Sequence, residues 1–226
     1  MQFLTAVLDL FFPRKCVFCK KILHVAETEY CEKCIETLPY TEFGSKFVGE
    51  YFDFCVSPLY YKGVVRKSLA RFKFNNAPIH AEALGKMLAE SIKEHPDMWT
   101  VGTSPPQLIY DFITWVPLSR KRKQIRGYDQ AKLLATETAK RLDSECVETL
   151  IKSTDVKPQS DISEAADRRA NVDGVYEIID STFVENKCIL VIDDIITTGS
   201  TLSECAKVLL DAGANRVICA CMARSE

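Results

Sequence analysis

The chain has 226 residues, of which 47% are apolar and 27% are charged, and its formal net charge is −2 at pH 7. These values are ordinary for a globular protein, and they exclude a disordered chain or one that coats nucleic acid through bulk positive charge. No apolar run approaches the about 20 residues that a membrane-spanning helix needs, so we expect no membrane insertion.

The first segment, MQFLTAVLDLFF, has the hydrophobic period of a helix. Its apolar residues recur on one side: Leu4, Val7, Leu8 and Phe11. It has no basic leading segment and no small-residue cleavage site, and Asp9 interrupts the apolar run. We therefore interpret it as an amphipathic helix and not as a signal peptide, and we expect a cytoplasmic protein.

Two CxxC pairs follow, with eleven residues between them: Cys16, Cys19, Cys31 and Cys34. Two such turns direct four thiolates at one point and complete a tetrahedral site that favours Zn²⁺ over iron. The alternatives are a redox pair and cysteines that only fill a core, but neither explains two pairs at this spacing. Because four protein ligands leave no open position, we expect a structural zinc that stabilises a segment too short for its own core.

Hydrophobic periodicity divides the rest of the chain into helices and strands. Helices are expected within residues 60–74, 79–95, 129–142 and 201–213, and strands within residues 108–117, 187–192 and 216–223. The last three elements form a strand–helix–strand unit, which builds a parallel sheet covered by helices. We therefore predict an α/β fold with a four-cysteine zinc module in residues 1–45 and a second domain in residues 46–226, in which the polar segment 153–174 is a surface loop.

The strand over residues 187–192 continues into Asp193 and Asp194, where we expect it to end. The TTGST sequence follows, and a helix begins at once. In an open parallel sheet ligands collect where the strands end, and a helix N-terminus presents backbone amides to an anion. Gly199 lets the backbone approach that anion, and four hydroxyls can donate to it: Thr197, Thr198, Ser200 and Thr201.

Two common nucleotide motifs are missing near this loop, because the chain has neither GxxxxGK[ST] nor GxGxxG. The loop therefore indicates a site for a single phosphate monoester. Asp193 and Asp194 would repel the phosphate, but they can accept hydrogen bonds from the vicinal hydroxyls of a sugar that carries it. A ribose 5-phosphate meets both demands. An N-capped helix after an ordinary strand would explain one hydroxyl but not the whole set.

The stretch VIDDIITTGSTL resembles the phosphoribosyl-pyrophosphate (PRPP) binding motif of type I phosphoribosyltransferases. With the four cysteines in front of it, the chain is similar to the ComF family, phosphoribosyltransferase-like proteins associated with natural competence. Three other stretches resemble that family: LFFPRKCVFC, VPLSRKRKQIRGYDQA and RRANVDGVY. In the second, Tyr128 and Asp129 stand where such proteins commonly carry phenylalanine and asparagine, which adds a negative charge beside the basic segment.

The resemblance implies a type I phosphoribosyltransferase-like domain over residues 46–226 and a ligand, PRPP, that binds with Mg²⁺. Asp193 and Asp194 would hold the ribose hydroxyls, and residues 197–201 would hold the 5-phosphate. It also implies a role in DNA uptake and transformation, with single-stranded DNA and competence proteins as partners.

A basic segment, PLSRKRKQIRG, is expected to be a loop between the strand ending at Val116 and the helix that follows Asp129. Five cations lie in seven residues: Arg120, Lys121, Arg122, Lys123 and Arg126. A solvated loop, a patch for nucleic-acid phosphates and a binding site for pyrophosphate all fit this composition. We favour the pyrophosphate site, with Arg126 first and Arg120 next, because departing pyrophosphate accumulates negative charge that cations stabilise.

Three functions fit these features. The first is a phosphoribosyltransferase, a glycosyltransferase that transfers ribose 5-phosphate to an unidentified nitrogenous acceptor, with Asp193, Asp194 and Arg126 as its catalytic residues. Lys73 and Tyr128 are the candidates for its general base. The second is a non-catalytic competence factor that binds single-stranded DNA through the basic segment and nearby aromatic residues. The third is a regulator that senses PRPP without turnover.

Overall fold

A parallel β-sheet forms the centre of the computed structural model, which describes residues 13–24, 27–74, 78–153 and 174–226. Its strands lie in the order β1 (Cys55–Val56), β7 (Arg216–Arg224), β6 (Cys188–Ile196) and β3 (Phe112–Trp115), and β2 (Leu59–Tyr60) also pairs with β7. Every pairing in this sheet is parallel. The predicted α/β class is therefore confirmed.

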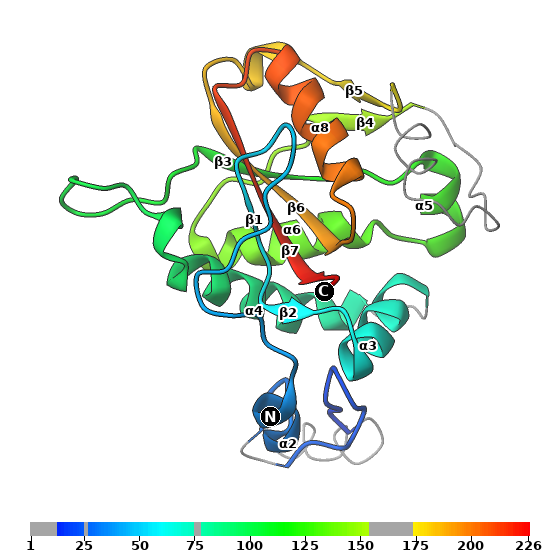
Figure 1. Cartoon of the computed structure of the whole chain (residues 1–226). Helices are drawn as coiled ribbons and strands as arrows, with labels where there is room; N and C mark the ends of the chain where they lie inside the picture. The colour runs from blue at the N-terminus through cyan, green and yellow to red at the C-terminus, as the bar shows by residue number, and fades with distance from the viewer. Residues whose placement is uncertain (1–12, 25–26, 75–77, 154–173) are drawn as a thin grey trace, which may run out of the picture.

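Helices cover both faces of the sheet (Figure 1). The α-helices of the described residues are α2 (Glu32–Thr37), α3 (Gly63–Phe74), α4 (Ala81–Glu94), α5 (Arg120–Arg126), α6 (Gln130–Leu142) and α8 (Ser200–Asp211). Single turns of 3-10 helix lie at η1 (Pro78–His80), η2 (Pro96–Met98) and η3 (Ser181–Phe183). A separate antiparallel pair, β4 (Leu150–Lys152) and β5 (Tyr176–Ile178), lies beside the main sheet. None of the described helices is long and apolar enough to cross a membrane.

Strand β6 supplies side chains to two separate hydrophobic cores. Leu190 and Ile192 belong to the core that contains α3, α4 and α6, whereas Ile189 and Val191 belong to the core that contains α8. This alternation follows from the geometry of a strand, in which successive side chains point to opposite faces. A continuous apolar run was therefore the correct indication of a strand that is buried on both faces.

The four-cysteine segment packs against α3 and α4. The Val17 carbonyl accepts hydrogen bonds from Ser68 Oγ at 2.8 Å and from Arg71 Nη2 at 2.8 Å, and the Tyr30 hydroxyl donates to the Ala83 carbonyl. Buried side chains of the segment belong to the same core as α3 and α4. A domain boundary near residue 45 stays a prediction.

The structure differs from the sequence-based expectations at particular elements. The basic segment was expected to be a loop, but residues 120–126 form α5, so that prediction was wrong. The helix is stabilised at both ends, because Ser119 Oγ accepts from Arg122 N and Gly127 closes it in the left-handed conformation. Strands β1, β2, β4 and β5 were not predicted, since two or three residues carry no period. The expected N-terminal helix and most of the expected loop at 153–174 lie outside the described residues.

Helices α4 and α6 make a close crossing at Gly85. A Cβ atom at this glycine would lie 2.6 Å from Glu137 Cβ and 3.0 Å from the backbone nitrogen of Thr138. The neighbouring atoms belong to a helix backbone and have little room to move. Glycine at this position therefore sets the distance between the two helices.

We predict that Gly85→Ala destabilises the protein by about 1–3 kcal/mol, because overpacking at the crossing outweighs the gain of about 1 kcal/mol in helix propensity. Urea unfolding monitored by circular dichroism measures this difference. Lys67→Ala on the exposed side of α3 is the control, with an expected change within about 0.5 kcal/mol. A Gly85→Ala variant more stable than wild type would contradict the close crossing.

Candidate functional site

Strand β6 extends further than its sequence suggested. Asp193 pairs with Cys221, and beyond the aspartates Ile195 and Ile196 still pair with β7. The expectation that the strand ends at Asp193 and Asp194 was therefore wrong, because β7 continues to Arg224 and offers partners. The two aspartates lie inside the strand, and the connecting loop begins only at Thr197.

The TTGST loop, residues 197–201, turns directly from β6 into α8. Gly199 has a φ of 77° and is the N-cap residue of α8, so it adopts a left-handed conformation that favours glycine. The loop, the first turn of α8 and Asp193 line one small cavity of about 30 Å³. Thr198 Oγ1 lies 2.9 Å from Ser200 Oγ across this turn. The predicted loop residues and Asp193 therefore come together around one volume at a helix N-terminus.

Contacts from distant parts of the chain hold the loop in place. A Cβ atom on Gly199 would lie 2.9 Å from Phe47 Cε1, and the Phe47 ring stacks on Phe52 with 6.4 Å between centroids. On the other side Ser225 Oγ donates to the Thr197 carbonyl at 3.2 Å, and Ser225 N donates to the Ile196 carbonyl at 2.9 Å. Phe47 and Ser225 were not identified from the sequence, because no local motif links them to the loop.

The two aspartates have different surroundings. Asp193 is partly exposed and faces the cavity at the start of α8. Asp194 is buried, and its Oδ2 lies 3.0 Å from Lys73 Nζ at the end of α3, an ion pair without the angle of a directed hydrogen bond. The two carboxylates do not therefore approach the cavity as an equivalent pair.

Burial and charge shift the titration of this cluster. Burial raises the pKa of Asp193 well above its usual value, and repulsion from Asp194 raises it further, while Lys73 opposes both effects. Burial lowers the pKa of Lys73, but attraction from Asp194 and Asp193 outweighs that effect, so its pKa is raised. Lys73 is therefore protonated at neutral pH. A cation bound at the cavity would stabilise the ionised form of the Asp193 carboxylate.

Arg126 lies at the end of α5, on the side of the cluster. Its Nη1 donates to Gln130 Oε1 at 2.8 Å, and its guanidinium carbon lies 4.8 Å from the centroid of the Phe74 ring. Burial lowers the pKa of Arg126, and the negative charge of Asp194 opposes that shift. The guanidinium is thus close enough to Asp194 to interact electrostatically with it.

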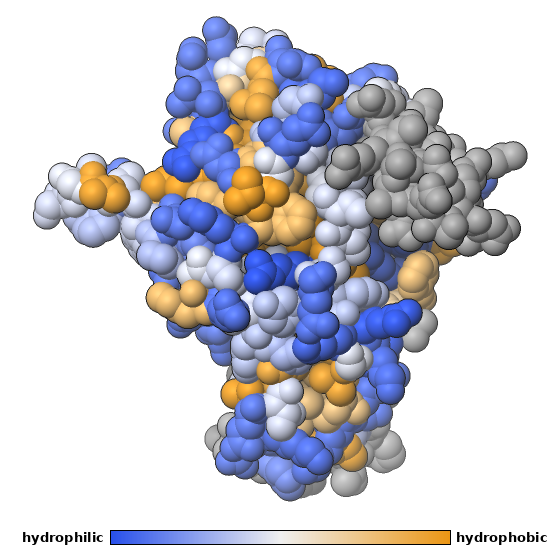
Figure 2. Space-filling model, viewed as in Figure 1, coloured by the Kyte–Doolittle hydropathy of each residue, from blue (hydrophilic) through white to orange (hydrophobic). Residues whose placement is uncertain are grey.

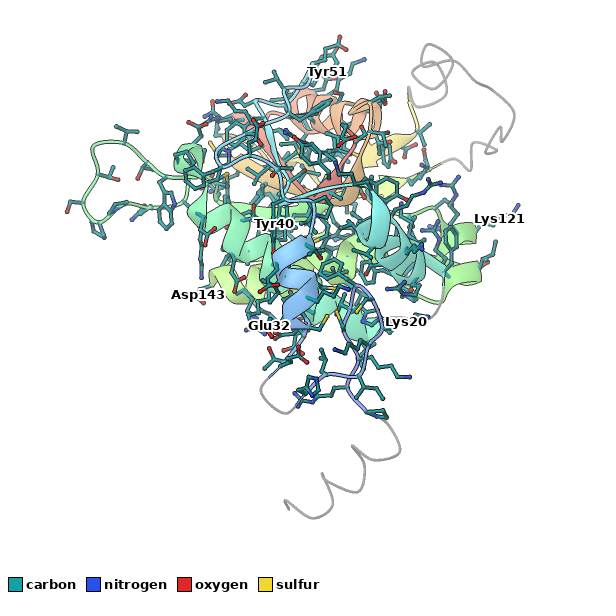
Figure 3. The ribbon with its side chains drawn as sticks, turned by 60° about the horizontal axis from the view of Figure 1, so that its bottom comes forward. Lys20, Glu32, Tyr40, Tyr51, Lys121 and Asp143 are labelled. Carbon is teal, nitrogen blue, oxygen red and sulfur yellow. The ribbon has the colours of Figure 1, made fainter. Side chains whose placement is uncertain are left out.

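The other predicted cations lie elsewhere. Arg120 is exposed at the start of α5 and lines a different cavity of about 520 Å³, together with Lys123 and Lys152. Lys121 points outward from α5 (Figure 3). The structure therefore brings Arg126, but not Arg120, towards the aspartates. The Tyr128 hydroxyl donates to the Phe72 carbonyl, beside Lys73.

The four N-terminal cysteines form a compact cluster. Their sulfur atoms all lie within 4.8 Å of one another, and Cys19 Sγ lies 3.6 Å from Cys31 Sγ. A tetrahedral ion with bonds of about 2.3 Å needs sulfur atoms about 3.8 Å apart. Burial raises the pKa of Cys16, but backbone N–H groups of Cys19, Cys31 and Phe18 lower it to about 7. The predicted ligands therefore form a cluster consistent with zinc.

Comparison with known proteins gives the following similarities. Residues 130–226 match the family model described as "Phosphoribosyl transferase domain". Competence protein F of Haemophilus influenzae is 26% identical over 224 residues, which is 92% of this chain and 95% of that protein. The DNA utilization protein YhgH of Escherichia coli strain K12 and competence protein ComFC of Bacillus subtilis are each 27% identical, over 69% and 68% of this chain.

The aligned regions cover 65% of YhgH and 56% of ComFC. Among solved structures, the glutamine PRPP amidotransferase from B. subtilis aligns with a TM-score of 0.42 and 20% identity, over 67% of this chain and 30% of that one.

The parallel sheet, the TTGST loop and the family match define a protein with a phosphoribosyl transferase domain, preceded by a four-cysteine cluster. The similarity to competence protein F extends over nearly the whole of both chains. The chain belongs to the ComF family, as its sequence motifs predicted.

Replacing Asp193 or Asp194 with a neutral asparagine should change the stability of the protein in opposite directions. Because its pKa is raised, ionised Asp193 costs stability above the unfolded-state pKa of about 3.9, and the cost grows as pH rises. Asp193→Asn should therefore raise the Tm at pH 8 and raise it less at pH 5. The asparagine Oδ1 can still accept the hydrogen bond that Asp194 N donates to Asp193 Oδ1 at 2.7 Å.

Asp194→Asn should destabilise the protein by about 1–3 kcal/mol, because it leaves the Lys73 charge without its counterion. Differential scanning calorimetry of both variants at the two pH values measures these effects. Equal changes of the same sign in the two variants would contradict the different roles of the carboxylates.

Proposed function

We propose that the protein binds the ribose 5-phosphate part of Mg²⁺–PRPP at the TTGST loop and catalyses displacement of pyrophosphate from C1 by a nitrogenous acceptor. The observation that carries the proposal is the cavity in which the loop, the N-terminus of α8 and Asp193 meet. An anion at a helix N-terminus is stabilised by backbone N–H groups and by the helix dipole. The domain match supports PRPP as the ligand.

The 5-phosphate would accept hydrogen bonds from the backbone amides at the start of α8 and from the hydroxyls of Thr198 and Ser200 in the loop. Gly199 is required because a side chain there would collide with Phe47 and would need a left-handed backbone. Rigid support of this kind holds the donors before the ligand arrives, which reduces the ordering cost of binding.

Asp193 would accept hydrogen bonds from the ribose hydroxyls, since it is the carboxylate that faces the cavity. Asp194 would orient the same sugar from within the strand, and Lys73 supplies its counterion. Carboxylate oxygens are ligands that Mg²⁺ accepts, and Asp193 would hold the ion that accompanies the pyrophosphate. Mg²⁺ would neutralise negative charge on the departing pyrophosphate.

Arg126 would stabilise the departing pyrophosphate, because its guanidinium lies within electrostatic reach of Asp194. Neither candidate for the general base is well suited to that role. Lys73 holds its proton through Asp194, and the Tyr128 hydroxyl is engaged with the Phe72 carbonyl. We therefore infer that the acceptor reacts without being deprotonated by Lys73 or Tyr128.

The relatives called competence protein and DNA utilization protein support a role in DNA uptake. One observation favours a second function, binding of single-stranded DNA without turnover. The exposed Phe74 ring lies beside Arg126, whose helix carries four other cations, and a base could stack on the ring while cations of α5 contact phosphates. A regulator that senses PRPP uses the same loop but releases no pyrophosphate.

We predict that Asp193→Asn weakens Mg²⁺–PRPP binding by about tenfold or more, because a neutral side chain cannot hold the ribose hydroxyls and the ion as strongly. Isothermal titration calorimetry of the purified chain with PRPP and Mg²⁺ measures this loss. The same substitution should abolish pyrophosphate release with any acceptor that supports it.

Asp211→Asn, which removes an exposed charge at the far end of α8, is the matched control and should bind PRPP as wild type does. If DNA affinity falls steeply with salt while PRPP fails to bind, the second function replaces the first.

We also predict that the four cysteines bind about one zinc ion per chain and that removing it lowers the Tm, since the segment shares its core with α3 and α4. Atomic absorption should show zinc lost in Cys19→Ser and Cys34→Ser but retained in Cys146→Ser, a half-buried cysteine outside the cluster. A metal-free protein with an unchanged Tm would disprove a structural zinc.

A further inference from the structure

The first CxxC turn, residues 16–19, packs against the second half of α3. Its two cysteines enclose Val17 and Phe18, whose carbonyls both accept hydrogen bonds from Arg71 Nη2, at 2.8 and 2.7 Å. Ser68, one helical turn earlier on α3, donates to the Val17 carbonyl at 2.8 Å. A single guanidinium nitrogen therefore binds the backbone that connects the two cysteines.

Arg71 also has a donor that these contacts leave unused. Its Nε is buried and has no hydrogen-bond partner among the described residues. In a guanidinium group the Nε–H and one Nη2–H leave the same edge of the plane, side by side. Because Nη2 binds the backbone of the CxxC turn, the Nε–H is directed towards that turn as well. Buried donors are rarely left unpaired, so this one indicates a nearby acceptor of another kind than a carbonyl.

The side-chain acceptors of the turn are its two sulfur atoms. Burial lowers the pKa of Arg71, and negative charge on Cys16 and Cys19 opposes that shift, so both sulfur atoms lie within electrostatic reach of the guanidinium. A thiol is a weak acceptor, whereas a thiolate forms strong, charge-assisted hydrogen bonds. Cysteines bind Zn²⁺ as thiolates, so metal binding supplies the acceptor that the Arg71 Nε–H requires.

The charge of the cluster gives a second reason for a cation at this place. Four thiolates and one Zn²⁺ have two negative charges in excess. Figure 2 shows hydrophobic residues among hydrophilic ones at the lower end of the molecule, where Figure 1 places this segment. Three of the four cysteines are buried: Cys16, Cys31 and Cys34. A negative charge that water solvates poorly needs a cation nearby.

Arg71 is better placed for this purpose than the cations next to the cysteines in sequence. Those neighbours are all exposed: Arg14, Lys15, Lys20 and Lys21. Water and salt screen the charge of an exposed side chain. Arg71 is only partly exposed, and the Val17 and Phe18 carbonyls hold its guanidinium in place.

We propose that Arg71 completes the zinc site from outside the four ligands: it donates its Nε–H to a thiolate of the first CxxC turn and balances part of the negative charge of the loaded cluster. Residues that bind the ligands of a metal orient them and set much of its affinity. The donor also lowers the nucleophilicity of the thiolates, which protects the exposed Cys19 from electrophiles. This inference rests on the proposed structural zinc.

Arg71→Gln tests the guanidinium, because glutamine removes the charge and the Nε–H while its amide can still donate to a carbonyl. We expect the variant to hold zinc about 10- to 100-fold more weakly. Competition with a chromogenic zinc chelator, at fixed pH and salt, measures the affinity of the full-length chain. Arg66→Gln makes the same change at an exposed position of α3, and this matched control should bind zinc as wild type does.

Two different failures can be told apart in this experiment. Unchanged zinc affinity in Arg71→Gln, or equal weakening in Arg66→Gln, would overturn the role of Arg71 and leave the zinc site standing. A wild-type chain that holds no zinc would overturn both.

The spectrum of the cobalt-loaded protein separates a hydrogen bond to sulfur from mere support of the turn. Co²⁺ bound to thiolates has a sulfur-to-metal charge-transfer band, and an N–H donor to sulfur moves this band to shorter wavelength. We expect Arg71→Gln to shift it to longer wavelength. Ser68→Ala removes the other side-chain hydrogen bond to the Val17 carbonyl without changing the charge, and it should leave the band in place. An unshifted band in Arg71→Gln, or an equal shift in both variants, would overturn the donor.

Arg71→Lys keeps the test decisive if Arg71→Gln does not fold. Lysine retains the charge but lacks the planar edge that reaches the carbonyls and the thiolate together, so the cobalt band should still shift while zinc affinity falls less. Iodoacetamide should release zinc from both variants several-fold faster than from wild type, since Cys19 is exposed. Release at the wild-type rate with an unshifted band would overturn the assignment.

Discussion

A group of three ionisable side chains, of which only Asp194 is fully buried, determines how the C-terminal end of β6 is arranged. Adjacent residues of a strand point to opposite faces, so Asp193 and Asp194 cannot share one environment. Lys73 at the end of α3 is the counterion of Asp194, which would otherwise be an unpaired carboxylate in an apolar core. Asp193 is left beside the TTGST loop with a raised pKa. The folded chain thus gives up some stability to keep a carboxylate at the mouth of the cavity.

The loop depends on the rest of the chain as much as on its own sequence. Phe47 comes from the segment before the sheet, and Ser225 comes from the end of β7, yet both contact the turn around Gly199. The four-cysteine cluster is connected to the same structure through the second half of α3, where Ser68 and Arg71 bind the Val17 carbonyl and Lys73 pairs with Asp194. The four-cysteine cluster, the position of α3 and the ion pair between Lys73 and Asp194 are therefore physically linked through one helix.

Long elements could be predicted from the sequence because their periods are local. The helix containing Leu134 and the buried strand containing Val191 each repeat an apolar pattern over several turns or residues, and the structure confirms both. The four cysteines and the loop residues were also correctly brought together, because each set is contiguous or regularly spaced. What the sequence could not indicate depends on contacts between distant segments. The pairing that extends β6 to Ile196 requires β7. The run of cations suggested a loop, because charge alone does not show that Ser119 and Gly127 cap the two ends of α5.

The central claim is that the TTGST loop holds the phosphate of a ribose 5-phosphate and Asp193 holds its hydroxyls. A crystal structure of the protein with Mg²⁺ and PRPP tests it most directly. Our account predicts the 5-phosphate within hydrogen-bonding distance of the amides of Gly199 and Ser200, with the ribose hydroxyls on Asp193. Density for the ligand on α5 alone, with the cavity at the start of α8 empty, would contradict it.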